Sequence, residues 1–345
     1  MNKKIGQILY EKDCHKQLRP ASVTKIMSIL LIMEALKDGT ITLDDKVPCS
    51  ETASSMGGSQ IWLEVGEELT VHEMLKAICV VSANDCVVAM AEFLCGSEEI
   101  FVQKMNERAK QLGMNDTCFK NSHGIDEDGH ITSSYDIALM SKELLNNHPT
   151  ITNYTTIWMD TLRNGESGLT NTNRLVRTYN GCTGLKTGST SLALYNLSAS
   201  ATRNDLSLIA VVMRAPTTKL RFSEAKLLLD YGFSNYEFSK LGTKDSVVKT
   251  VEVSKGSKNS IDLVFEKDCG ALIKTGDSSK IEQEIIINEN ICAPILKDDI
   301  LGTANYYIDG SLISSVNLIA NSDIPKKNIF NTFSNLSENW FNLLK

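Results

Sequence analysis

The chain has 345 residues, of which 42% are hydrophobic and 22% charged, and its formal net charge is -7. This length can bury a sizeable core and is sufficient for two domains. The negative charge argues against a nucleic-acid-binding protein, because no dense basic stripe is available to neutralise phosphates. No uninterrupted apolar run reaches membrane-spanning length, so we expect a soluble body.

The chain has nine cysteines, an odd number, and none of them forms a CxxC pair. Cys79, Cys86 and Cys95 lie in helical apolar patterns, where a cysteine is usually a small buried hydrophobic residue. This usage favours a reduced or weakly oxidising setting over a disulfide scaffold.

The five histidines have no HExxH or similar spacing, so we expect no metal and no cofactor. The residues after Met1 lack the apolar centre of a signal peptide. We therefore expect either a cytoplasmic protein or a trimmed mature form.

The first two thirds of the chain predict a mixed α/β arrangement, with helices early and strands later. The expected strand and helices before residue 150 are 5–12, 22–37, 70–78, 86–91, 98–112 and 134–146. The most convincing later strands are 194–199 and 206–213, and a helix at 223–231 closes this part.

The helix that begins near Ser22 is the central feature of the sequence. Pro20 is suited to open a helix, and Ser22 and Lys25 are then one turn apart on the same face. A lysine at the mouth of an apolar helix is partly desolvated, which favours the neutral amine that can take a proton from a hydroxyl. The alternative is a serine N-cap beside a solvated lysine, which is common for an isolated SxxK.

A polar break at 81–85 separates two apolar helical stretches. Ser82 and Asn84 would project from it, where a hydroxyl can relay a proton and an amide can bind a substrate backbone. The alternative is an ordinary helix cap, because serine and asparagine are common capping residues.

Lys186, Thr187 and Gly188 form a Lys-Thr-Gly tripeptide in a region of strands. A lysine with a glycine two residues later on a strand edge allows a substrate backbone to pair alongside while the ammonium attracts an anion. The same tripeptide occurs at 274–276, so position must decide between the two.

The last third changes in character to short alternating strands and charged turns. We predict a catalytic domain at 1–237, a small β-rich domain at 238–324 and an amphipathic helix at 326–345. That helix carries aromatics on one side and suits a membrane interface, although packing on its own domain or on a partner is an equal alternative.

The ordered combination of SxxK, SxN and KTG is typical of penicillin-binding proteins and class A β-lactamases. Together with 20–27, 82–85, 123–126, 185–188 and 224–233, it resembles the serine-type D-alanyl-D-alanine carboxypeptidases, the low-molecular-mass penicillin-binding proteins. The resemblance implies a penicillin-binding-protein/β-lactamase-like α/β (α+β) catalytic domain with a helical subdomain, followed by a small β-rich domain and the terminal helix.

The resemblance also implies the roles of individual residues. Ser22 would attack the carbonyl between the two terminal D-alanines of a peptidoglycan stem peptide, with Lys25 as its general base and Ser82 as the proton relay. The substrate-binding residues would be Asn84, Lys186, Thr187, Gly188 and Ser189. The N–H groups of Ser22 and Ser189 would form the oxyanion hole. β-Lactams would acylate Ser22.

The resemblance places such a protein at the outer face of the bacterial cytoplasmic membrane, in the cell envelope, with the terminal helix on the membrane surface. Three features depart from the pattern of the family. The export signal and an additional first strand are absent, Arg214 replaces a common glycine, and nine cysteines are unusual for an exported protein. Arg214 would either add a positive charge near the substrate carboxylate or be an ordinary surface residue.

Several rival functions share these residues. A class A β-lactamase would need an ExxLN loop between Asn84 and Lys186, and the sequence has none. A DD-endopeptidase or transpeptidase would use identical residues, and a non-catalytic envelope-binding protein would keep only the fold. The sequence does not indicate the preferred diamino acid of the stem, the oligomeric state or the growth stage of use.

Overall fold

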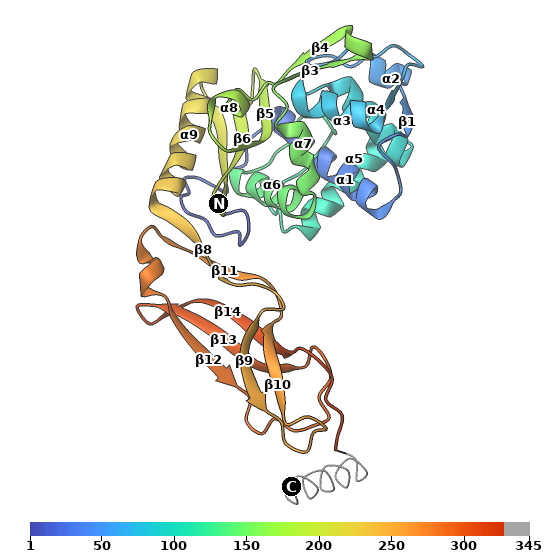
Figure 1. Cartoon of the computed structure of the whole chain (residues 1–345). Helices are drawn as coiled ribbons and strands as arrows, with labels where there is room; N and C mark the ends of the chain where they lie inside the picture. Colours follow the sequence, from blue (N-terminus) through green and yellow to red (C-terminus); the bar gives the residue numbers. More distant parts are fainter. Residues whose placement is uncertain (328–345) are drawn as a thin grey trace, which may run out of the picture. The chain divides into compact units, whose positions relative to one another are not determined.

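The computed structural model describes residues 1–327, and its contacts divide the chain into two units, Met1–Ser234 and Asn235–Lys345 (Figure 1). The first unit holds a group of helices and a sheet, and the second is built from strands. Each unit has its own hydrophobic core.

The helices of the first unit begin and end where local sequence signals place them. Thr70 caps α3 with a full capping box to Glu73, and Gly39 ends α1 in the left-handed conformation, with φ of 80°. The helices and single turns are η1 Ala21–Thr24, α1 Lys25–Asp38, α2 Glu51–Ser54, α3 Val71–Val80, α4 Asn84–Cys95, α5 Glu98–Gln111, α6 Ser134–Asn147, η2 Pro149–Ile151, α7 Thr152–Thr155, η3 Arg163–Gly165, α8 Leu175–Thr178 and α9 Thr218–Asn235.

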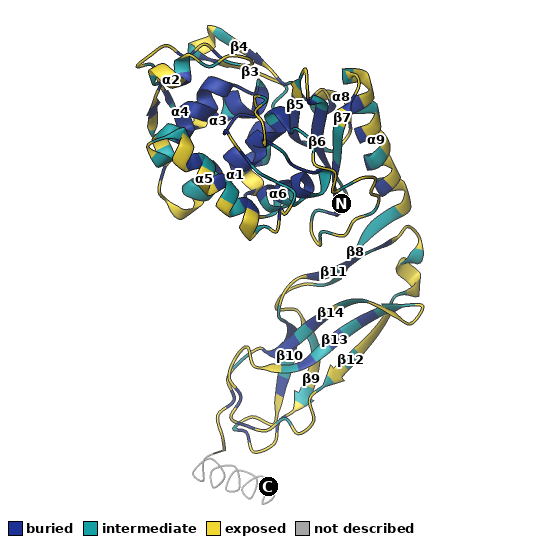
Figure 2. Ribbon diagram, turned by 180° about the vertical axis from the view of Figure 1, so that it is seen from behind, coloured by how far each residue is buried: buried dark blue, intermediate teal, exposed yellow. Residues whose placement is uncertain are grey.

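The sheet of the first unit has the antiparallel order β5-β6-β7. Helix α6 lies against β6 and β7, and α9 packs so closely on β7 that a Cβ at Gly232 would lie 2.4 Å from a methyl group of Leu208. Both faces of the strands are therefore covered, and buried residues run through α3, α4 and β5 in Figure 2. The strands are β1 Lys46–Pro48, β2 Glu68–Thr70, β3 Met159–Leu162, β4 Ser167–Thr170, β5 Cys182–Thr190, β6 Leu194–Arg203 and β7 Leu206–Ala215.

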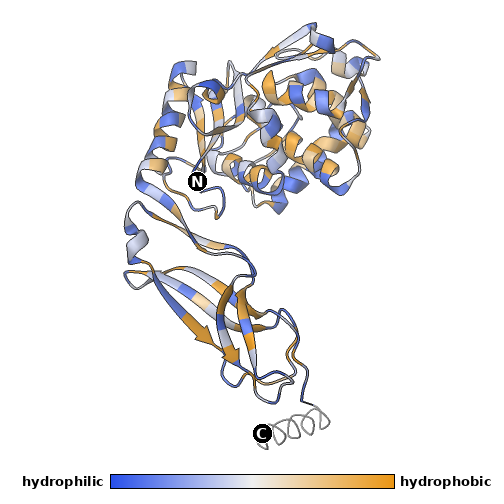
Figure 3. Ribbon diagram, in the orientation of Figure 1, coloured by the Kyte–Doolittle hydropathy of each residue, from blue (hydrophilic) through white to orange (hydrophobic). Residues whose placement is uncertain are grey.

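The second unit is a five-stranded antiparallel sheet with the order β12-β13-β14-β10-β9, together with the two-stranded pair β11-β8. Its core includes Leu263, Ala304 and Leu318, all without exposed surface. Along β13 buried residues alternate with more exposed ones, as expected for a strand with one face on the core. Figure 3 shows hydrophobic and hydrophilic residues along the strands of this unit. The elements are β8 Tyr236–Gly242, β9 Val247–Glu252, β10 Ser260–Phe265, β11 Cys269–Lys274, η4 Asp277–Lys280, β12 Glu282–Ile287, β13 Ile300–Ile308 and β14 Ser311–Ala320.

The predicted strand at 5–12 is wrong, because this segment forms turns and loop. The side chain of Asn2 accepts the N–H of Ile5, and Gly6 has φ of 76°, so the backbone turns where the apolar pattern suggested extension. β13 and β14 form a hairpin, and Asp309 and Gly310 at its turn both have positive φ.

The predicted order of an α/β unit followed by a β-rich one is confirmed. Most of the predicted helix at 326–345 lies outside the described residues, which end at 327. Among the described residues, no helix has both the length and the apolar character needed to cross a membrane. All nine cysteines are described, and each is a free thiol.

Candidate active site

Ser22 and Lys25 meet at the junction of two helical segments. Ser22 lies in the single turn η1, and Lys25 is the first residue of α1. Lys25 Nζ is 3.2 Å from Ser22 Oγ. The predicted one-turn spacing is therefore confirmed. The α-helix predicted to begin near Ser22 begins three residues later, at Lys25.

The Lys25 amine is completely buried and contacts two acceptors besides the serine. Nζ lies 2.5 Å from the side-chain oxygen of Asn84 and 2.8 Å from the carbonyl oxygen of His123. Burial, and secondly the charge of Lys186, hold the pKa of Lys25 well below its usual range. In its neutral form the amine can donate its two N–H groups to these two acceptors and take the proton of Ser22 with its lone pair.

Lys186 and Ser82 form the second contact of the site. Lys186 lies in β5 with 1% of its surface exposed, and its Nζ donates to Ser82 Oγ at 2.8 Å and to the carbonyl oxygen of Thr187 at 3.0 Å. Burial is the main cause that lowers the pKa of Lys186 to about 7. Ser82 has φ of 67°, an uncommon conformation for a residue with a side chain, and this turn aims its hydroxyl at the lysine.

Asn84 is held by a loop that sequence reasoning did not connect with the site. Its side-chain NH₂ donates to the carbonyl oxygen of Gly57 at 2.7 Å, and its backbone N–H donates to that of Ser59 at 2.6 Å. The amide is thereby oriented with its oxygen toward Lys25. The Gly57-Gly58 turn signal predicts a loop but does not indicate its partner.

The end of the Lys-Thr-Gly strand passes directly against the turn that carries Ser22. A Cβ at Gly188 would lie 2.8 Å from the backbone nitrogen of Val23 and 2.9 Å from that of Ser22. Only glycine permits this approach, which brings the neighbouring Ser189 beside the same turn. Thr187 Oγ1 is 2.6 Å from Thr172 Oγ1, a hydroxyl contact that the sequence analysis missed.

His123 and Gly124 support the turn from the other side. The ring of His123 is buried, and burial, with the nearby Lys25 charge, lowers its pKa to about 3, so the imidazole is neutral. A Cβ at Gly124 would lie only 2.0 Å from the carbonyl oxygen of Ala21, which requires glycine there. The contacts of this loop with Lys25 and with Ala21 hold it against the turn that carries Ser22.

Two arginines lie near this end of the sheet in different settings. Arg214 is exposed, which supports the surface alternative for this residue. Arg221, which sequence analysis missed, is buried and its guanidinium donates to the carbonyl oxygens of Gly188 and Asn196 at 3.3 Å. Arg221 therefore brings positive charge to the strand that carries Lys186.

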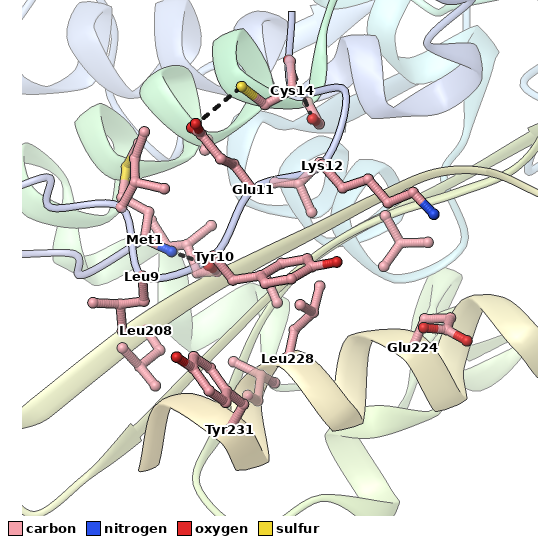
Figure 4. Close-up of a pocket in the computed structure, with 18 of the residues that line it drawn as sticks. Met1, Leu9, Tyr10, Glu11, Lys12, Cys14, Leu208, Glu224, Leu228 and Tyr231 are labelled. Atoms are coloured by element: carbon pink, nitrogen blue, oxygen red, sulfur yellow. Dashed lines mark hydrogen bonds between the residues drawn. The ribbon is translucent and has the colours of Figure 1, made fainter. Parts of the chain in front are cut away.

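A cavity of about 520 Å³ lies elsewhere in the first unit, between the N-terminal segment, β7 and α9. Figure 4 shows its lining, in which Tyr10, Leu228 and Tyr231 are labelled. The lining contains none of the motif residues, so this cavity is separate from the site built around Ser22.

Comparisons with known proteins identify the family of this chain. Residues 1–217 match the Peptidase_S11 model, described as D-alanyl-D-alanine carboxypeptidase, and residues 236–326 match the C-terminal domain of penicillin-binding protein 5. The chain is 45% identical to D-alanyl-D-alanine carboxypeptidase DacF of Bacillus subtilis, over 97% of this chain and 87% of that protein. It is 32% identical to DacA of Escherichia coli, over 94% of this chain and 82% of that protein. A crystal structure of penicillin-binding protein 5 from Haemophilus influenzae superposes with a TM-score of 0.83 at 32% identity, covering 94% of this chain and 96% of that one.

Proposed function

Because the chain belongs to the D-alanyl-D-alanine carboxypeptidase family, a group of serine peptidases that β-lactams acylate, we propose that Ser22 carries its acyl-enzyme. The reaction is hydrolysis of the bond between the two terminal D-alanines of a peptidoglycan pentapeptide stem. The observation that carries the assignment of Ser22 is the buried amine of Lys25, 3.2 Å from the hydroxyl oxygen. Both other contacts of that amine are to acceptors.

In the first step the lone pair of Lys25 takes the Ser22 proton as Oγ attacks the penultimate carbonyl carbon. Negative charge then develops on the carbonyl oxygen. We assign its stabilisation to the N–H groups of Ser22 and Ser189. The close approach of Gly188 to the backbone nitrogen of Ser22 supports this assignment.

In the second step the bond to the terminal D-alanine breaks, and the leaving amine needs a proton. Ser82 relays to this amine the proton that Lys25 took from Ser22, which returns Lys25 to its neutral form. The bond from Lys186 orients the Ser82 hydroxyl for this relay. Lys186 and Thr187 hold the terminal carboxylate, and Asn84 binds the peptide group of the substrate. Water then attacks the ester with Lys25 as base, which frees Ser22.

The nucleophile can be tested with a fluorescent penicillin. We expect the full chain to be labelled covalently and a Ser22→Ala variant to take no label while keeping the wild-type melting temperature. Ser28, a buried serine one turn after Lys25 in α1, provides the matched control, because Ser28→Ala should still be labelled. Labelling of the Ser22→Ala variant would exclude Ser22 as the acylated residue.

The reaction itself can be tested by mass spectrometry of products from a synthetic pentapeptide. Release of a single D-alanine is the expected result. Cleavage of a cross-linked dimer instead, or transfer to an added amine, would indicate an endopeptidase or a transpeptidase.

The family acts on the peptidoglycan of the cell envelope. We assign residues 1–237 to catalysis and 238–324 to a separate β-rich domain, and we place the protein at the outer face of the cytoplasmic membrane, with 326–345 as an amphipathic anchor. The aromatic spacing of that segment supports the anchor. Deleting 326–345 should move the protein from the membrane to the soluble fraction with peptide hydrolysis retained, and unchanged fractionation would remove this role.

A further inference from the structure

A second cavity, of about 810 Å³, lies between the loop that holds Asn84 and the β3–β4 hairpin. One wall carries Trp62, which is 75% exposed, the most exposed of the large hydrophobic side chains among the described residues. Such an aromatic has a ring available for a ligand, because it does not contribute to the core.

The backbone at Trp62 is clamped from both sides. The buried carboxylate of Asp85 accepts the N–H groups of Ile61 at 3.0 Å and Leu63 at 3.1 Å. Arg163 donates to the carbonyl oxygens of Ile61 and Trp62 at 3.0 and 3.3 Å. Trp62 itself has φ of 55°, which is strained for a bulky residue and is held by these bonds. The exposed ring is therefore presented on a rigid support.

This support is continuous with the proposed active site. Asp85 follows Asn84, whose backbone N–H and side chain are bound by Ser59 and Gly57 of the same loop. Val81, which lines the cavity, immediately precedes Ser82. In a substrate held by Asn84, the residue that precedes the two D-alanines would thus point toward this cavity.

The walls of the cavity carry an excess of negative charge. They include three carboxylates, Glu64, Glu67 and Glu166, against one guanidinium, Arg163. Arg163 is neutralised by Glu67 through a contact of 2.7 Å. Among residues 1–327, no ion pair is found for the exposed Glu64 and Glu166.

We propose that Trp62, with Glu64 and Glu166, binds the side-chain ammonium of the diamino acid that precedes the two D-alanines in an uncross-linked stem. The inference rests on the proposed function and names a specificity determinant for it. A tryptophan face is the aromatic surface that attracts a cation most strongly, and the carboxylates add to the attraction. A cross-linked stem has this nitrogen in an amide, so the site selects stems that have not been joined.

The test compares two peptides, an Nα-acetylated Lys-D-Ala-D-Ala with its ε-amine free and the same peptide with that amine acetylated. We expect the wild-type chain to have a higher kcat/KM for the free amine. Trp62→Ala should lower the ratio of the two kcat/KM values about 5- to 30-fold, from the usual strength of a cation–π contact. Trp62→Phe should retain part of the preference, and Glu64→Gln with Glu166→Gln should lower the ratio about 2- to 5-fold.

The matched control is Met159→Ala, an exposed residue of the β3–β4 hairpin that does not line the cavity, and the ratio should be unchanged in it. Raising the ionic strength should also lower the wild-type ratio. Fluorescent penicillin labelling reports whether each variant is folded. If Trp62→Ala does not fold, the ratio measured in the Glu64→Gln, Glu166→Gln variant tests the site instead.

An equal kcat/KM for both peptides in the wild type, or an unchanged ratio in the folded Trp62→Ala variant, would overturn the inference. If the wild type takes penicillin but hydrolyses neither peptide, the carboxypeptidase function fails first, and the specificity site fails with it.

Discussion

The chain contains the tripeptide Lys-Thr-Gly twice, and the two copies have opposite surroundings. Lys186 of β5 has 1% of its surface exposed and bonds Ser82, whereas Lys274 is exposed at the end of β11. Gly188 lies against the backbone of Ser22, whereas a Cβ at Gly276 would have no neighbour within 4 Å. The environment of each lysine is therefore set by the elements that pack on its strand, and not by the tripeptide itself.

The physical difference lies in what covers each strand. The single turn η1 and the polar break at Ser82 pack on β5, so its lysine is desolvated and its pKa falls to about 7. The copy at 274–276 leads from a two-stranded pair into a turn whose glycine has φ of 90°. Gly276 provides the left-handed backbone that its turn requires, whereas Gly188 allows β5 to approach the backbone of Ser22 and Val23.

The largest expected effect comes from removing each lysine in turn. Lys186→Ala should reduce kcat/KM for the pentapeptide by at least about 100-fold, because it removes a desolvated charge from the proposed binding site of the terminal carboxylate. Lys274→Ala should leave kcat/KM within about 2-fold, since exposed side chains contribute little. Steady-state hydrolysis measures both, and equal losses would contradict the distinction between the copies.

The two glycines should separate activity from stability. Gly188→Ala pushes β5 away from the backbone nitrogens of Val23 and Ser22, so we expect a loss of about 10- to 100-fold in kcat/KM from a shift of the site. Gly276→Ala has space but a left-handed backbone, so it should cost about 1 kcal/mol of stability with activity retained. Denaturant unfolding alongside hydrolysis distinguishes the two, and full activity in Gly188→Ala would show that the close approach is dispensable.

The depressed pKa of Lys186 predicts a pH-dependent stability difference. Below pH 7 the lysine is charged in both folded and unfolded chains, and the buried charge destabilises the fold. Between about pH 7 and its ordinary value near 10.5 the unfolded chain binds more protons, so the wild type gains stability as pH rises. Lys186→Met lacks this gain.

The measurement is the melting temperature of Lys186→Met minus that of the wild type. We expect this difference to be most positive near pH 6 and to shrink by several degrees toward pH 9, at about 2–4 °C for each kcal/mol. Lys274→Met should show no such trend. A difference that stays constant with pH would mean that the folded chain does not depress the lysine pKa.

Much of this architecture could be predicted from the sequence, because the signals are local. The helices expected at 22–37 and 70–78 are found as α1, which ends at Gly39, and α3, which begins with a capping box at Thr70. The expected spacing of Ser22 and Lys25 is also confirmed. The family resemblance is also confirmed, by matches over nearly the whole chain. The individual catalytic roles stay predictions.

The individual contacts that the sequence analysis did not predict join residues that are far apart in the chain. Lys186 and Ser82 are 104 positions apart, and the partner of Asn84 is the loop at Gly57. Arg221 lies in a helix with no local sign that its guanidinium reaches the carbonyl of Gly188. No periodicity records such pairings, and at 5–12 a side-chain turn at Asn2 overrode the apolar pattern.

The smallest effect should come from the threonine pair of the first copy. Thr172 Oγ1 is 2.6 Å from Thr187 Oγ1, so Thr172 positions the hydroxyl expected to hold the substrate carboxylate. Thr172→Val keeps the shape but removes one hydrogen bond, and we expect KM to rise about 2- to 10-fold with little change in kcat. Thr172→Ser should restore KM, and Thr275→Val in the second copy should not alter it. If the serine variant behaves like the valine variant, the methyl packing of Thr172, and not its hydroxyl, positions Thr187.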